Sequence, residues 1–127
     1  MKKLILAMAL SAPLSAQAGE FEATERMFQA VLDVCKQRQE NATNIGKILS
    51  RGILNTEQLA DTAKFNQHYK SVILATGKAL NDGKNLSSYY RHCVIDMVNA
   101  IDDLGKLNNS QMQEAINDIA VKAFDKL

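Results

Sequence analysis

Three side chains able to do chemistry stand close together in the sequence: His92, Cys93 and Asp96. A cysteine nucleophile needs a base within hydrogen-bond reach of its sulfur. Neighbouring residues on a helix project about 100 degrees apart, so His92 and Cys93 would face different directions. His92 and Asp96 would share a face, where such a pair contributes about 0.3 to 0.5 kcal/mol. The stretch therefore predicts a surface pair beside a structural cysteine, not a thiol active site.

Patterns of other catalytic and cofactor sites are missing after residue 18. His68 and His92 are the two histidines of the chain, and no C-x-x-C or Glu-x-x-His pair accompanies them. Neither G-x-S-x-G nor S-x-x-K occurs, and the carboxylates of Asp102-Asp103 would diverge on a helix. A non-covalent haem could use methionine ligands, and the chain offers Met27, Met97 and Met112. Methionines at helical spacing are more often core residues, so we expect these three to pack in the core. The sequence thus predicts no enzyme, no metal site and no cofactor.

The two cysteines of the chain, Cys35 and Cys93, are expected to form a disulfide. Thiols of an exported protein are driven toward oxidation, although a free or intermolecular cysteine is the alternative. Cys35 falls near the end of one expected helix and Cys93 near the start of another, so antiparallel packing would bring them together. A bridge closing a loop of this length stabilises the fold by roughly 4 kcal/mol in the chain-entropy model.

The N-terminus has the three parts of a cleaved secretory signal. Lys2 and Lys3 precede the apolar run 4–10, and small residues end at Ala18. That run is too short for a membrane anchor, which needs roughly 20 apolar residues. We therefore expect a signal peptide over residues 1–18, a single domain over 19–127 and no stable membrane insertion. The periplasm is the expected location, with secretion as the alternative.

The charge balance gives no reason to expect a nucleic-acid partner. Removing Lys2 and Lys3 with the signal lowers the formal net charge from +1 to −1. Nucleic-acid binding requires clustered Lys and Arg, and an anionic membrane surface attracts the same residues. The near-neutral chain therefore favours neither partner.

Apolar residues after the signal recur every three or four positions, which predicts helices. No period-two alternation typical of strands is present. Expected helices span 22–39, 43–51, 56–81, 87–107 and 110 onward, with Asn55 or Thr56, and Ser110 with Gln113, as N-terminal caps. Gly52 should end the second segment. We predict a small all-α antiparallel bundle of four main helices and one short helix, with one disulfide.

The helix expected over 87–107 should bury one face and expose another. Tyr90, Cys93, Val94 and Met97 are expected to point inward. A polar stripe is expected outward, made of Tyr89, His92, Asp96, Asn99 and Asp103. Tyrosine offers a large contact area at low entropic cost, so we expect this stripe, with Lys84 in the preceding loop, to bind a protein partner.

A signal peptide followed by a small crosslinked helical domain is similar to the plan of periplasmic immunity and inhibitor proteins. That resemblance implies a non-enzymatic protein that occludes a partner, such as a cell-wall-degrading effector or a lysozyme. The alternatives are a periplasmic small-molecule carrier or stress chaperone, and an accessory component of an envelope secretion or conjugation system. The sequence does not fix the partner, the oligomeric state or the binding face.

Overall fold

The computed structural model describes residues 15–127, with side chains from residue 25 onward. The described part is all-α and contains no strand, as the periodicity predicts. Its elements are α1 (Ser15–Ser50), α2 (Thr56–Asp61), α3 (Gln67–Asn81), α4 (Tyr89–Asn99), α5 (Ile101–Leu104) and α6 (Asn109–Lys122), with 3-10 turns η3 (Leu86–Ser88) and η4 (Ala123–Lys126).

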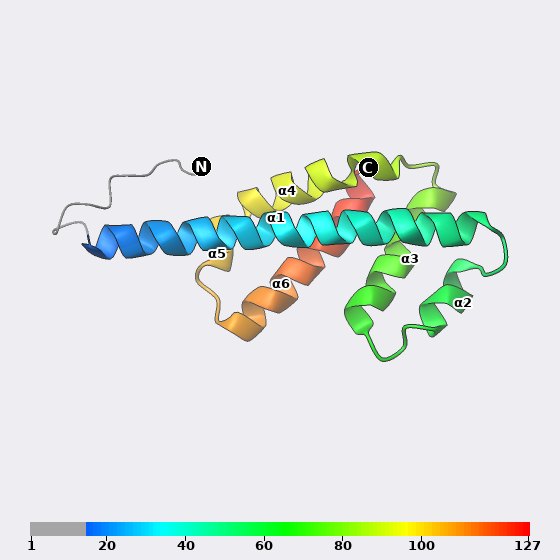
Figure 1. Ribbon diagram of the computed structural model, residues 1–127, viewed down its shortest axis with the longest axis horizontal. Helices are drawn as coiled ribbons and strands as arrows, with labels where there is room; N and C mark the ends of the chain where they lie inside the picture. Colours follow the sequence, from blue (N-terminus) through cyan, green and yellow to red (C-terminus); the bar gives the residue numbers. More distant parts are fainter. Residues whose placement is uncertain (1–14) are drawn as a thin grey trace.

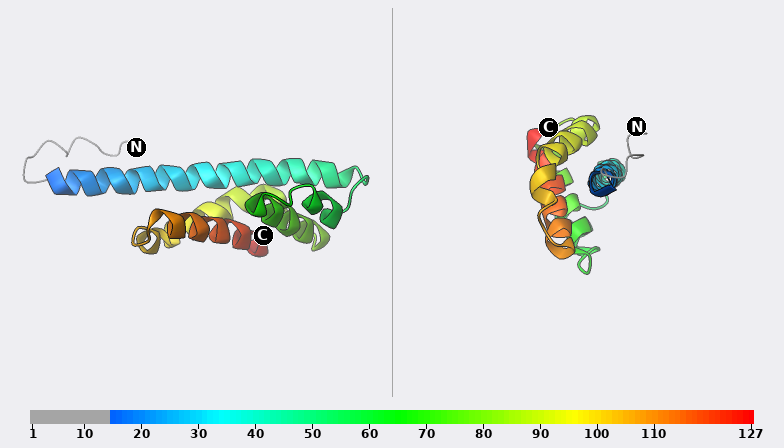
Figure 2. Two further views of the ribbon diagram at one scale, coloured as in Figure 1. Left: turned by 90° about the horizontal axis from the view of Figure 1, so that it is seen from below. Right: turned by 90° about the vertical axis from the view of Figure 1, so that its left-hand side faces the viewer.

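The helices form two layers, because α1 lies along one side of all the others (Figure 2). α4 runs antiparallel to α1, whereas α3 and α6 cross α1 obliquely (Figure 1). The N-terminal part of α1 extends past the other helices (Figure 2). The fold is therefore a small helical bundle built on one long helix.

Residues 1–14 of the predicted signal peptide lie outside the described residues. The remaining four, 15–18, are the start of α1. The cleavage after Ala18 stays a prediction.

The two segments expected over 22–39 and 43–51 are one continuous helix. Its buried positions keep the same spacing through the polar stretch around residue 41, since Cys35, Ala42 and Ile45 are all fully buried. Packing on this face outweighs the weak helix propensity of the Asn and Thr residues there. The helix ends before Gly52, whose φ of 73° is a conformation that glycine adopts without strain.

The single helix expected over 56–81 is instead two, α2 and α3. The chain turns at 62–66, where the Thr62 hydroxyl donates to the Leu59 carbonyl at 2.6 Å. Asn66 then begins α3, because its side-chain oxygen accepts from the Tyr69 amide at 3.1 Å. Of the two predicted caps, Asn55 and Thr56, the structure has Asn55, which forms a capping box with Gln58.

Two predictions about the last third of the chain are wrong. The helix expected over 87–107 breaks at Ala100 into α4 and α5. The capping box of α6 uses Asn108 and Gln111, not Ser110 and Gln113. Asn is an N-cap at least as good as Ser, so the first residue able to cap the helix sets its start.

The core lies between the two layers and is joined across them by the disulfide. Cys35 of α1 bonds to Cys93 of α4, with 5.7 Å between the Cα atoms and both residues fully buried. The predicted crosslink is thus confirmed.

Thr76 is the one polar residue buried in the described part of the chain, and its hydroxyl has no hydrogen-bond partner there. The largest buried apolar residues include Val31, Ile45, Val72, Ile73, Tyr89, Met97, Leu104 and Phe124.

Candidate functional site

The predicted outward position of Tyr89 is wrong. Tyr89 is fully buried, its hydroxyl donates to the Ala120 carbonyl at 2.6 Å, and its ring stacks on Phe124 with 4.1 Å between centroids. Burial raises the pKa of the Tyr89 hydroxyl well above its usual value, so the hydroxyl stays a proton donor. Tyr89 therefore anchors α6 and η4 to α4 and cannot contact a partner.

Tyr90 occupies the exposed position that Tyr89 was expected to hold, and its predicted inward orientation is also wrong. The buried positions of α4 are Tyr89, Cys93 and Met97, four residues apart. The turn η3 lies directly before α4, and Tyr89 enters the core because its ring stacks on Phe124. Because two tyrosines are adjacent, the sequence alone could not decide whether Tyr89 or Tyr90 faces the core.

The other residues of the predicted stripe do not form a continuous exposed surface. His92 is half-buried, and Asp96, whose side chain is only 15% exposed, pairs with Lys126 at 3.0 Å. Asn99 and Asp103 are exposed, as predicted. The Asp103 carboxylate lies 3.9 Å from the Lys106 ammonium.

Lys84 lies apart from this stripe. It lines a cavity of about 210 Å³ together with Lys78, Asp82, Phe124 and Asp125. Partner binding by the stripe and by Lys84 stays a prediction for the exposed members and is withdrawn for Tyr89.

A side chain of α1 caps α4. Ser88 makes no side-chain capping bond. Instead the Gln39 amide donates to the Leu86 carbonyl at 3.1 Å and its oxygen accepts from the Tyr90 amide at 2.9 Å. The start of α4 is therefore fixed by tertiary contact with α1, close to the disulfide.

A polar cluster joins three helices on the surface. Arg38 of α1 donates to the Asn117 side-chain oxygen at 2.6 Å, and the Asn117 amide lies 3.2 Å from His68 Nε2. The three groups satisfy one another, so the cluster holds α1, α6 and α3 together.

A groove of about 480 Å³ separates the C-terminal end of α1 from α2 and the end of α3. This volume is within the range of small-ligand sites. The helices approach closely at its base, because a Cβ on Gly77 would lie 2.8 Å from the Cβ of Thr56. Its lining is half apolar or glycine and half polar: Gly46, Leu49, Leu54, Gly77 and Leu80, with Ser50, Asn55, Thr56, Glu57 and Asn81.

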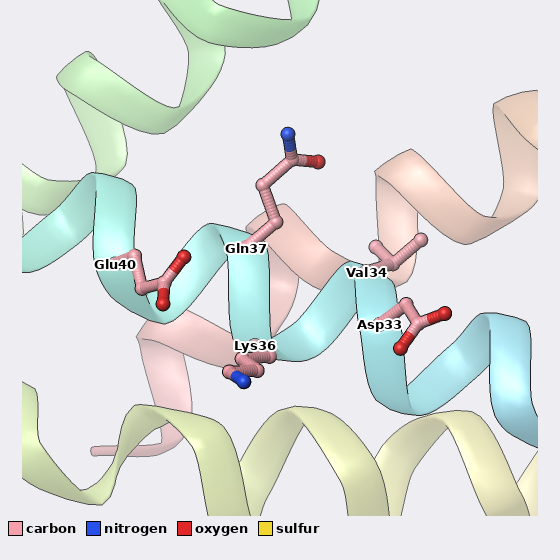
Figure 3. A pocket seen from close by; sticks show the side chains of 5 residues that line it. All are labelled: Asp33, Val34, Lys36, Gln37 and Glu40. Atoms are coloured by element: carbon pink, nitrogen blue, oxygen red, sulfur yellow. The ribbon is translucent and has the colours of Figure 1, made fainter.

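A second surface depression lies on α1 itself, and its lining residues are Asp33, Val34, Lys36, Gln37 and Glu40. All five come from one helix, and their side chains point in different directions (Figure 3). They include both signs of charge. These side chains do not converge on a common point, so the depression offers no defined binding chemistry.

Exposed large apolar side chains gather in the segment 53–80. Four of the seven in the described part of the chain belong to it: Ile53, Phe65, Leu74 and Leu80. Phe65 is 94% exposed at the turn between α2 and α3, and Ile53 is 80% exposed before α2. The turn projects from the body on the side of the molecule away from α4 (Figure 1).

Sequence reasoning missed this apolar segment because it placed Phe65 within a long helix. The signal that could have found it was Asn66, a good N-cap after the polar residues Asp61 and Thr62. A helix that is capped by Asn66 leaves Phe65 in the turn before it, outside the amphipathic patterns of α2 and α3.

Among the described residues, no three His, Cys, Asp or Glu side chains gather as a metal site would require. No helix in that part of the chain has the length and apolar character needed to cross a bilayer.

Comparison of the chain with protein families, curated proteins and solved structures found no significant match.

Proposed function

We propose that the chain is an exported, non-enzymatic binding protein that acts in the periplasm by occluding a protein partner. The proposed partner is a cell-wall-degrading effector or a lysozyme, which would make the chain an immunity or inhibitor protein. Export is supported by the disulfide, because such bonds persist in oxidising compartments.

One observation carries the proposal: exposed apolar side chains gather in the segment 53–80 of a crosslinked domain. Contiguous exposed apolar surface on a folded domain typically marks a protein interaction site, and the four exposed side chains of this segment are the candidates for such a surface. A scaffold held by a buried disulfide also loses little conformational entropy on binding, and this favours tight association.

The test is to purify the tagged full-length protein from periplasmic extract, identify stoichiometric partners by mass spectrometry, and challenge a deletion strain with neighbouring strains. We expect one partner in a fixed ratio and sensitivity of the deletion strain to attack. If no stoichiometric partner is found and the deletion strain survives like the parent, the proposal fails.

A second candidate, a small-molecule carrier, is favoured by the groove between α1, α2 and α3. Native mass spectrometry of protein purified from cells distinguishes the two. A retained small ligand that is lost in a Gly46→Leu variant would support a carrier, because that side chain would fill the groove.

A further inference from the structure

The geometry points to the α2–α3 turn, residues 62–66, as a preformed plug. The turn enters an apolar pocket on a protein partner, and carboxylates rim that pocket. This inference rests on the proposed function and names the binding surface and the chemistry of the partner.

The turn is held in shape by its own hydrogen bonds. The Ala63 amide donates to the Ala60 carbonyl at 3.0 Å and the Asn66 amide donates to the Ala63 carbonyl at 2.9 Å. The Thr62 hydroxyl and the Asn66 cap fix its two ends. A turn ordered before binding presents its tip with a smaller cost in backbone entropy.

Phe65 at this tip is almost fully exposed, with the Lys64 ammonium 5.2 Å from its ring centroid. An aromatic side chain buries roughly 150 to 250 Å² when it enters a pocket. Burial of that size makes aromatic residues the usual anchors of protein interfaces. Phe65 is therefore the side chain that gains most from entering a partner.

The α3 side of the tip is cationic, whereas the α2 side carries Glu57 and Asp61, so it is the α3 side that favours carboxylates on a partner. Residues 62–81 contain Lys64, Lys70 and Lys78 but no Asp or Glu. Leu74 is 40% exposed on α3, and Lys78, one turn farther on, is also exposed. A pocket edged by carboxylates complements this cationic, partly apolar surface.

Shape and charge favour a protein over a bilayer. The turn projects as a narrow convex corner in two perpendicular views (Figures 1 and 2). A flat anionic bilayer would meet α2 as well as α3, and the exposed Glu57 and Asp61 of α2 would be repelled by it. A cleft can instead enclose the corner and place its carboxylates on the α3 side.

The experiment uses the full-length protein, Phe65→Ser as the variant and Ile95→Ser as the control. Ile95 is a comparably apolar residue, 45% exposed on α4. Unchanged denaturation curves for both variants show that they fold. We expect Phe65→Ser to weaken binding of the purified partner by about 30-fold or more in calorimetry, and Ile95→Ser to leave binding unchanged.

A photoreactive phenylalanine at position 65 identifies what the turn contacts. We expect its crosslink to map by peptide mass spectrometry to a pocket of the partner that contains carboxylates, and the same probe at position 95 to give none. Lys64→Glu combined with Lys70→Glu should slow association and reduce its salt dependence.

Each contrary result has a distinct meaning. A partner that binds wild type and Phe65→Ser equally overturns the plug and leaves the proposed function standing. Absence of any stoichiometric partner overturns both. Phe65-dependent flotation with phosphatidylethanolamine and phosphatidylglycerol vesicles, or a Phe65-dependent dimer in sedimentation, overturns the protein pocket in favour of a bilayer or a second copy.

Discussion

The α1–α4 pair and the α2–α3 pair differ in how strongly they expose large apolar side chains: on α1 and α4 the exposed fraction reaches 45% at Ile95, whereas it reaches 94% at Phe65 in the α2–α3 turn. Between α1 and α4, the disulfide is fully buried and Gln39 caps the start of α4. Around α2 and α3, Ile53 and Phe65 lie in solvent. The α1–α4 pair buries apolar residues that stabilise the fold, whereas the α2–α3 pair exposes several of its own apolar residues. The difference places the crosslinked scaffold and the proposed contact surface in separate parts of this small domain.

The largest test of this comparison removes the crosslink. Replacing Cys35 and Cys93 together with Ala should lower the free energy of unfolding by about 4 kcal/mol, because the unfolded chain regains the entropy of an open loop. Urea denaturation followed by circular dichroism measures the loss. A change below about 1 kcal/mol would contradict the role of the α1–α4 pair as the stable part.

The α2–α3 pair has one tight contact of its own, which Gly77→Ala should break. The added Cβ would lie 2.8 Å from the Cβ of Thr56, so the two helices must separate, at a cost of about 1 to 3 kcal/mol in the free energy of unfolding. Gly46→Ala is the control, because its Cβ would lie 3.3 Å from the flexible end of Leu86. Equal effects of both substitutions in thermal denaturation would show that the α2–α3 contact is loose.

Tyr89→Phe removes a single buried hydrogen bond, which joins α4 to α6. We expect a loss of about 1 kcal/mol, since the buried Ala120 carbonyl loses its donor. The folded-state pKa of Tyr89 is raised, so its stabilising effect is fully present below the unfolded pKa of about 10 and declines as pH rises above it. Wild type should lose more stability than Tyr89→Phe between pH 9 and 11, whereas Tyr90→Phe should follow wild type.

Phe65→Ser should have the smallest effect on folding. A side chain that is 94% exposed contributes little to the folded state, so we expect a change within about 0.5 kcal/mol in the free energy of unfolding. A larger loss in urea denaturation would mean that Phe65 packs against the domain in solution, and the contrast between the two pairs would disappear.

The sequence was sufficient wherever one residue type decided the outcome. The two cysteines predicted the crosslink, Asn55 predicted the start of α2, and Gly52 predicted the end of α1. The sequence was insufficient where two adjacent residues could each occupy the same core position. Tyr89 and Tyr90 are chemically equal, and only the packing of Phe124, from a distant part of the chain, places one of them in the core.

The cap that Gln39 provides for α4 has a consequence for the order in which the molecule matures. On the proposed export route the chain would emerge N-terminus first, so Cys35 would arrive well before its partner Cys93. The beginning of α4 lacks a side-chain cap of its own and is completed only when α1 packs against it. Docking of α4 on Gln39 aligns the two thiols, and we therefore expect oxidation to seal a helix pair that has already assembled.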